Sequence, residues 1–265
     1  MSETEENPFE LPLTKRLDIT GHELRVTALG LDKSGSRLIT GSLDGRIRMH
    51  DFAAMDSMCR SFREVEPYEG QRVTGVTWHP NAQHFLVTTS SWQPLIYDRD
   101  LHPESKVEFA KGWMYIRDLK KAKGHVAPIN GSQVLLFQAL SFSFLETVVV
   151  QWRPDVPDEF ITWSQDGSVR VWRTDRIHES LHTLRPTSVT GARLRLRTST
   201  LAHGGRTLVM GCEDGSLQLF DMRGSLVAPA KTVKKAHDVS GTLSRGDNTG
   251  DGKQIVQIVS TSYNV

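Results

Sequence analysis

Three segments of this chain share one pattern, in which an Asp-Gly pair separates two short apolar stretches. The aspartates are Asp44, Asp166 and Asp214, and a large ring-bearing side chain stands six residues after each of them. Glycine adopts the positive φ of a tight turn, so Asp-Gly between alternating apolar runs predicts two antiparallel strands. Alternation with a period of two places the apolar side chains on one face of a sheet. The chain is therefore expected to be a series of β-hairpins.

A further, degenerate copy, second in chain order, comprises residues 85–90 and 95–98. Pro94 lies in its turn, where a missing N–H breaks no sheet hydrogen bond. The ring positions of the four copies lie 47, 75 and 48 residues apart. They are His50, Tyr97, Trp172 and Phe220. A period of about 40 to 45 residues with four short strands per unit is typical of WD40 proteins. We therefore predict an all-β fold, a WD40 β-propeller.

The residues around each copy also resemble a WD repeat. Gly-His at 21–22 and 124–125, and Ala-His at 236–237, resemble the Gly-His that opens such a repeat. In that family the histidine, a serine or threonine, the turn aspartate and the tryptophan form a buried hydrogen-bonded tetrad, and a buried carboxylate needs such partners. Numbered in chain order, the third repeat (around Asp166) is implied to have a complete tetrad and the first (around Asp44) a tetrad without tryptophan. The fourth repeat (around Asp214) retains the aspartate alone. The residues are His22, Thr40, Asp44, His125, Thr162, Asp166, Trp172 and Asp214.

The repeats account for about four and a half blades of the seven expected in such a propeller. A lead at 1–20 includes a candidate closing strand at 13–19, and the partial propeller follows at 21–265. Its blades are expected at about 21–66, 71–111, 124–180, 190–226 and 236–265, the last of which stops at its hairpin turn. Open sheet edges favour aggregation or pairing with another chain. We therefore expect the isolated chain to be poorly soluble or unstable.

The third repeat contains an excess of residues. His125 and Asp166 lie 41 residues apart, whereas His22 and Asp44 lie 22 apart. The excess falls in an apolar run, and deletion of 133–150 restores both the spacing and a Gly-x-x-Trp-x-Pro motif. Because loops are rarely so apolar, we interpret this segment as foreign to the blade, from a retained intron or a gene-model error. A genuine long loop is the alternative.

Composition is that of an ordinary globular protein. The 265 residues are 38% apolar and carry a formal net charge of +1, so neither disorder nor bulk attraction to nucleic acid or an acidic membrane is indicated. The most apolar run, 134–150, is too short and too polar for a membrane span. Two cysteines, Cys59 and Cys212, and an acidic N-terminus unlike a signal peptide favour an intracellular location.

More specific motifs point to one family within the WD40 proteins. Met-Tyr-Ile-Arg-Asp-Leu at 114–119, Ser-Phe-Arg-Glu-Val-Glu-Pro at 61–67 and Tyr-Asp-Arg-Asp at 97–100 resemble the gastrulation-defective family, also called WD repeat-containing protein 70. The resemblance covers the chain from about residue 7 onward. It implies a nuclear, non-enzymatic scaffold linked to DNA double-strand-break repair and to cullin-RING ubiquitin ligases, as a substrate receptor. The apolar insert, the absent C-terminal blades and the absent charged N-terminal region depart from the family.

Two groups of residues are candidate contact sites. Such receptors often carry Trp-Asp-x-Arg at the end of a blade, and the resemblance implies contact with a ligase adaptor at Phe220, Asp221 and Arg223, where phenylalanine replaces tryptophan. A basic stretch places alternate arginines on one predicted strand face, a contact for an acidic partner or nucleic acid. These are Arg193, Arg195 and Arg197. A solvated arginine is the simpler alternative in both cases.

The sequence offers little support for catalysis. A His–Asp pair can orient a general base, but these pairs recur at repeat spacing without a recurring serine or cysteine nucleophile. No metal-ligand cluster, phosphate-binding glycine loop or nucleophile motif is recognisable. We therefore expect no enzymatic activity, no cofactor, no metal and no small-molecule substrate. Nucleic-acid or chromatin binding through the basic stretch is the alternative to a scaffold that binds proteins.

Overall fold

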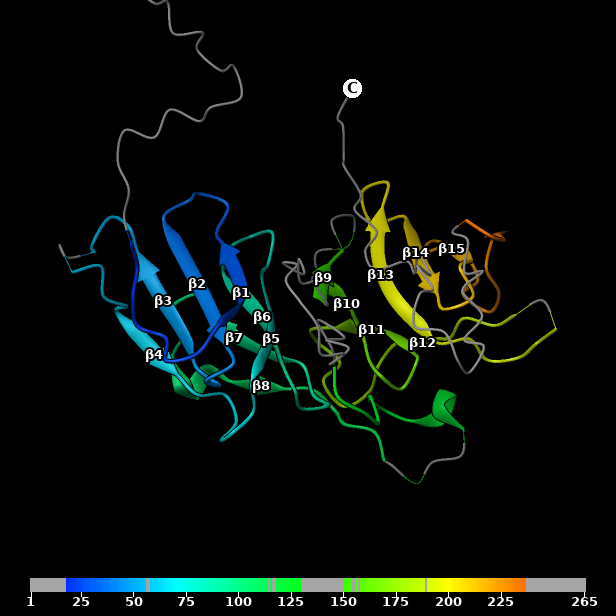
Figure 1. The fold of residues 1–265 in the computed structure, drawn as a ribbon, viewed down its shortest axis with the longest axis horizontal. Coiled ribbons are helices and arrows are strands. Elements are labelled where there is room, and N and C mark those ends of the chain that lie inside the picture. Colours follow the sequence, from blue (N-terminus) through cyan, green and yellow to red (C-terminus); the bar gives the residue numbers. More distant parts are fainter. Residues whose placement is uncertain are drawn as a thin grey trace, which may run out of the picture.

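The computed structural model describes residues 18–55, 58–113, 115, 118–129, 150–153, 156, 158–188 and 190–236. Within these ranges the chain forms four antiparallel sheets of four strands each, together with two short 3₁₀ turns (Figure 1). In every sheet the strands are neighbours in chain order. The prediction of an all-β fold is confirmed. No helix in the described ranges has the length and apolar character needed to cross a membrane.

The sheets follow one another along the chain. The first contains β1 (Val26–Leu31), β2 (Arg37–Ser42), β3 (Ile47–Asp51) and β4 (Arg63–Val65). The second contains β5 (Val73–Trp78), β6 (His84–Thr89), β7 (Leu95–Asp98) and β8 (Val107–Glu108). The third contains β9 (Val150–Trp152), β10 (Glu159–Trp163), β11 (Val169–Arg173) and β12 (His182–Leu184). The fourth contains β13 (Leu196–Ala202), β14 (Thr207–Cys212), β15 (Leu217–Asp221) and β16 (Lys231–Val233). The 3₁₀ turns are η1 (Pro103–Ser105) and η2 (Leu119–Lys121).

The four sheets repeat one another in register. In each sheet the ring position of the third strand is paired with an apolar residue of the second strand. These pairs are Leu38–His50, Phe85–Tyr97, Phe160–Trp172 and Leu208–Phe220. At the Asp-Gly turns, Gly45, Gly167 and Gly215 have φ values of 83°, 73° and 75°, the left-handed conformation that favours glycine. Asp44, Asp166 and Asp214 are therefore equivalent corners of successive hairpins.

The sheets stand side by side as blades of an incomplete propeller. In Figure 1 the first strands β1 and β13 face the middle of the arrangement, whereas β4 lies at its outer side. Strands β1 and β2 pack against β5, and β5 and β6 pack against β9. One hydrophobic cluster joins the first and second sheets, and another joins the second, third and fourth. The described sheets do not close into a ring, as the prediction of a partial propeller requires.

One face of the first sheet is uncovered by the residues that the structure describes. Leu29 and Leu31 of β1 are 65% and 56% exposed, although both are large apolar side chains. They alternate along the strand with Gly30, where an added Cβ would lie 3.3 Å from Val76 Cγ1 of the second sheet. Because each blade of a propeller normally packs on both neighbours, this leucine face is the open edge of the described blades.

The sheet limits differ in places from the predicted blade limits. The third sheet extends to Leu184 and the fourth to Val233, beyond 180 and 226, because a three-residue fourth strand leaves little pattern in a sequence. Val150 pairs with Thr162 and so belongs to β9 rather than to the interpreted insert. The rest of that insert, residues 133–149, lies outside the described residues. So do 13–17 of the candidate closing strand and the fifth blade from residue 237 onward.

Candidate functional site

The third sheet contains a buried chain of hydrogen bonds. Trp172 Nε1 donates to Thr162 Oγ1 over 2.7 Å, and His125 Nε2 lies 2.8 Å from the same oxygen. His125 Nδ1 lies 3.1 Å from a carboxylate oxygen of Asp166. The carboxylate accepts the Nδ1 proton, so the Thr162 hydroxyl donates to Nε2 while it accepts from Trp172. The structure thus brings together the four residues that the resemblance assigned to this tetrad.

The charges of this network are fixed by its surroundings. Burial acts to raise the pKa of Asp166, but hydrogen bonds from His125 and Ser168 outweigh it and hold the pKa well below its usual range. Burial lowers the pKa of His125, although the bond to Asp166 opposes the shift. Asp166 is therefore an anion beside a neutral imidazole at pH 7. Both side chains are enclosed, which suits a structural bond and leaves no access for a substrate.

The first sheet contains a weaker form of the same network. His22 Nδ1 lies 2.9 Å from Asp44, and His22 Nε2 lies 2.8 Å from Thr40 Oγ1. His50 stands where the third sheet has tryptophan, and its Nδ1 has no hydrogen-bond partner among the described residues. Burial lowers the pKa of His50, and the nearby His22 and Arg48 lower it further. Three of the four positions are thus connected in this sheet.

The fourth sheet replaces the polar network with apolar side chains. Met210 and Phe220, at the hydroxyl and ring positions, are both buried. Asp214 caps its own turn by accepting bonds from the backbone N–H and the hydroxyl of Ser216. This sheet therefore buries no hydroxyl or indole N–H that would need a partner at those two positions.

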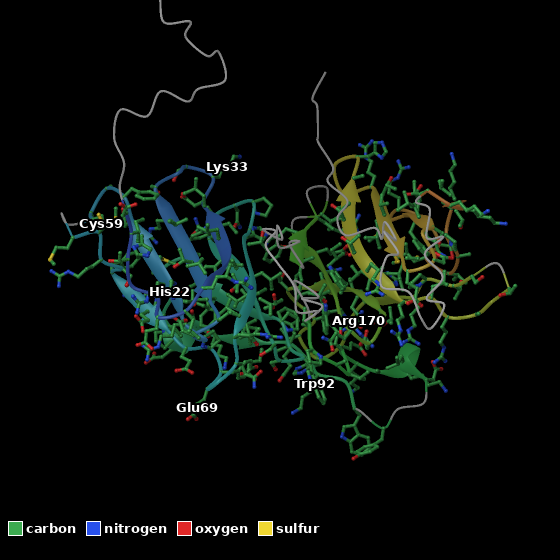
Figure 2. The ribbon with its side chains drawn as sticks, viewed as in Figure 1. His22, Lys33, Cys59, Glu69, Trp92 and Arg170 are labelled. Carbon is green, nitrogen blue, oxygen red and sulfur yellow. The ribbon has the colours of Figure 1, made fainter. Side chains whose placement is uncertain are left out.

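A further position that recurs in the sheets was missed by sequence reasoning. Arg48, Arg170 and Gln218 each stand four residues after a turn aspartate. Arg170, which is fully buried, donates to the carbonyls of Ala122 and Leu119 over 2.7 and 3.1 Å and to Ser180 Oγ over 2.8 Å. Figure 2 places it near the middle of the molecule, whereas Glu69 lies at the periphery.

The three side chains share a role. Gln218 Nε2 donates to the carbonyl of Thr187 over 2.7 Å, and Arg48 packs against Gly21. Each side chain therefore ties its sheet to the segment that precedes the sheet. Burial lowers the pKa of Arg170 to about 10, so it remains a cation at pH 7. The repeated spacing from the aspartate was the signal that could have revealed this role.

A hollow of about 540 Å³ opens between the third and fourth sheets. It is bounded by the Asp166 turn, by the loop that links β12 to β13, and by Trp163 and Leu196. The lining residues include four arginines and two acidic residues, a formal excess of two positive charges. These are Arg185, Arg193, Arg195, Arg197, Asp166 and Glu213. The carboxylate of Asp166 is itself enclosed. The three arginines that the sequence singled out thus line one concave site.

The local structure of these arginines differs from the predicted strand face. Strand β13 begins at Leu196, so Arg193 and Arg195 lie in the loop before it and Arg197 lies in the strand. The register of β13 shifts between Leu196 and Thr198, which breaks the alternation. Arg195 is largely exposed, with 82% of its side chain accessible and a 3.9 Å ion pair to Glu213.

Comparison with known proteins identifies the first repeat and relatives of the chain. The model of the family "WD domain, G-beta repeat" matches residues 13–51, a range that ends at the last residue of β3. WD repeat-containing protein 70 of Xenopus tropicalis is 32% identical over 83% of this chain, and that of Homo sapiens is 31% identical over 89%. Gastrulation defective protein 1 homolog of Drosophila melanogaster is 30% identical over 89%. The chain is a WD40-repeat protein related to WD repeat-containing protein 70.

The matched region is one part of these larger proteins. The chain spans about a third of the length of each relative, between 32% and 34%. The identity of about 30% extends over 83% to 89% of this chain, far more than the length of one repeat. The similarity is therefore not confined to the single repeat that the family model matches.

The predicted adaptor contact of this WD40 protein is divided between core and surface. Phe220 and Met222 are buried, so they pack inside the fourth sheet. Arg223 is 62% exposed in its side chain and donates from Nε and Nη2 to the Asp221 carboxylate, over 3.1 Å each. The hydrogen bonds from Arg223 lower the pKa of Asp221. The structure thus leaves Asp221 and Arg223, but not Phe220, available to a partner.

One group of side chains has the composition of a metal site. Ligand atoms of Asp98, Asp100 and His102 lie within 4.8 Å of one another. These groups are already paired: Asp98 bonds to His102 and to Ser105, and Asp100 pairs with Arg37. The cluster closes the turn after β7, so its geometry is explained without an ion.

Proposed function

We propose that this chain is a non-enzymatic interaction module that binds another protein over the loops around the hollow between the third and fourth sheets. The observation that carries the proposal is the gathering of four arginines around one hollow in a chain of net charge +1. Complementary charge around a concave surface attracts and selects an oppositely charged partner. A WD40 repeat is consistent with protein binding in general.

Charge reversal at the rim of the hollow tests this proposal. Arg195→Glu changes an exposed side chain whose loss leaves the hydrophobic core intact. Arg176→Glu is the matched control, because Arg176 is about half exposed, forms an ion pair with Glu179 and lies outside the hollow. In quantitative affinity purification from cells, we expect Arg195→Glu to lose specific partners that Arg176→Glu retains. Equal partner sets for the two variants and the wild type would contradict the proposal.

A second candidate function is docking to the adaptor of a cullin-RING ubiquitin ligase, as the family resemblance implies. Arg223 supports it, because an exposed guanidinium oriented by Asp221 at the end of β15 can present donors to an acidic or carbonyl surface. Arg223→Ala should abolish co-purification of the adaptor, whereas Arg173→Ala, which removes a similarly placed pair with Asp175, should not. Unchanged co-purification of the adaptor with Arg223→Ala would remove this role.

We propose a nuclear location and a part in DNA-damage repair on the same family resemblance. A tagged full-length protein should accumulate in the nucleus and should associate with chromatin after double-strand breaks are induced. A cytoplasmic distribution that breaks do not change would rule this out.

Direct nucleic-acid binding is the alternative use of the arginines. It predicts an affinity that falls steeply with salt concentration, whereas a protein scaffold shows no such affinity for DNA. The net charge of +1 favours the scaffold, because nucleic-acid binding usually uses a broad basic stripe.

A further inference from the structure

The hollow between the third and fourth sheets occurs where the repeat pattern is broken by one residue. Gly41, Trp163 and Gly211 occupy equivalent positions, each paired with the first residue of the following strand. A Cβ atom at Gly41 would lie only 2.4 Å from Val73 Cγ1, so glycine here permits the next sheet to approach closely. The third sheet has the largest side chain at this position.

The neighbour of Trp163 is equivalent to the neighbour of Gly41. Val73 and Leu196 both begin the first strand of a sheet, and in both strands the register shifts directly after that residue. Trp163 and Leu196 both line the hollow. Between the third and fourth sheets the indole therefore occupies the position that corresponds to the close contact of Gly41 with Val73 between the first and second sheets. It keeps β13 from approaching the third sheet as closely as β5 approaches β1 and β2. The opening is thus a consequence of a specific substitution in the repeat.

The chemistry of this opening suits an anion. Trp163 is only 5% exposed, and its Nε1 has no hydrogen-bond acceptor among the described residues. A buried N–H without an acceptor costs free energy, so an oxygen-bearing ligand in the hollow favours a small rotation of the indole that gives this N–H an acceptor. Arg185, which donates to the backbone carbonyl of Asp166, is held against the same hollow. The lining therefore combines oriented donors with an excess of two positive charges.

We propose that this hollow binds a phosphorylated side chain of a partner protein. A phosphate monoester carries about −1.5 to −2 charges at pH 7 and three acceptor oxygens, which match the excess charge and the donors of the lining. Arginine guanidinium groups bind phosphate through paired N–H donors. The volume of about 540 Å³ accommodates the phosphorylated residue with its neighbours. The inference rests on the proposed function and names the chemistry of its partner.

A nucleic acid is a poorer match to the same lining. The arginines surround one concavity that is also lined by Glu213, and do not form a stripe along which a backbone of repeated phosphates can lie. A single phosphate on a protein segment requires one such pocket. The salt dependence and competition arms of the experiment separate the two.

The test uses the full chain and a fluorescein-labelled peptide library with a fixed central phosphoserine, compared by anisotropy with the same library containing serine. We expect the phosphorylated library to bind at least about tenfold more tightly, as one or two charge-assisted bonds provide. The double variant Arg193→Gln/Arg197→Gln should lose at least about tenfold in affinity. Trp163→Phe, which keeps a ring and removes the N–H, should lose about three- to tenfold. Arg176→Gln should bind as the wild type does.

Folding is checked independently of binding. Each variant is compared with the wild type by circular dichroism and thermal unfolding. The indole N–H resonance that disappears in Trp163→Phe should shift when the phosphorylated library is added to the wild type. No shift of that resonance would overturn the assignment of Trp163 to the site.

Other outcomes also overturn the proposal. These are equal affinity for the two libraries, an unchanged affinity in the double arginine variant, or displacement of the peptide by inorganic phosphate or by a DNA oligonucleotide at the same concentration. The proposed function is tested separately by the loss of cellular partners in Arg195→Glu. If that loss occurs while phosphorylation has no effect on peptide binding, the interaction module stands and the phosphate pocket does not.

Discussion

Removal of one hydroxyl from the third sheet should lower the free energy of unfolding much more than removal of the equivalent hydroxyl from the first sheet. Thr162→Val leaves two buried groups without partners, the Trp172 indole N–H and His125 Nε2. Thr40→Val leaves one, His22 Nε2, because His50 makes no bond to Thr40 among the described contacts. The two substitutions are chemically identical and occur at the same position of the repeat, so each controls for the other.

The expected magnitudes follow from the number of groups left unsatisfied. A buried polar group that loses its only partner lowers the free energy of unfolding by about 1 to 3 kcal/mol. Burial of the methyl group that replaces the hydroxyl offsets part of this loss. Thr162→Val should therefore lower the free energy of unfolding by about 2 to 5 kcal/mol. Thr40→Val should lower it by about 1 to 2 kcal/mol, since the His22 side chain retains 8% exposure.

Urea unfolding followed by tryptophan fluorescence measures both values. The free energies come from linear extrapolation, and an unchanged dependence on urea for the three proteins shows that they unfold in the same way. A loss for Thr162→Val that is no greater than that for Thr40→Val would refute the account, because the hydroxyl would then not serve two buried partners.

Three further predictions concern the buried arginine, pH and the open edge. Arg170→Met should lower the free energy of unfolding by about 2 to 4 kcal/mol, because the carbonyls of Leu119 and Ala122 lose a buried donor; Arg170→Lys should recover part of this in urea unfolding. His125 has a lowered pKa when folded, so below about pH 6.5 the unfolded chain binds more protons. Stability measured between pH 7.5 and 5 should then fall with a slope that reaches about 1.4 kcal/mol per pH unit, whereas a flat profile would contradict a buried neutral imidazole. Leu29→Lys/Leu31→Glu should reduce self-association in sedimentation velocity, because it places charge on an exposed apolar strand face; the same substitutions should leave the thermal unfolding temperature nearly unchanged.

The features that could be predicted from the sequence are those with a local cause. The hairpin corners follow from Asp-Gly alone, since Gly45, Gly167 and Gly215 need the left-handed conformation wherever the sheets lie. The tetrad of the third repeat was assigned by family resemblance. Thr162 and Trp172 stand at the same spacing from the turn aspartate as Thr40 and His50 do in the first repeat, whereas His125 lies much further from its aspartate than His22 does.

The remaining features depend on contacts between segments that are distant in sequence. Three-residue strands such as β16 exist only because a longer neighbour pairs with them, and they carry no pattern of their own. Arg193 and Arg195 lie in a loop because β13 begins only at Leu196, and the register shift after Leu196 then breaks the alternation that the sequence suggested. The hollow depends on two neighbouring sheets together, yet one signal was present: Thr-Gly-Ser, Thr-Trp-Ser and Met-Gly-Cys align at one position, and only the third repeat has a large side chain there.

A final prediction tests whether that position sets the separation of neighbouring sheets. Gly41→Ala places a methyl 2.4 Å from Val73 Cγ1, so Val73 and the strand that carries it must move, at a cost of about 1 to 3 kcal/mol. Val73→Ala alone should also destabilise the chain, because it opens a cavity in the cluster that joins the first two sheets. The double variant should be more stable than the sum of the two losses implies, since the new methyl occupies the space that the old ones vacate. If Gly41→Ala is neutral in urea unfolding, this position does not determine how closely the sheets approach, and Trp163 cannot be the cause of the hollow beside it.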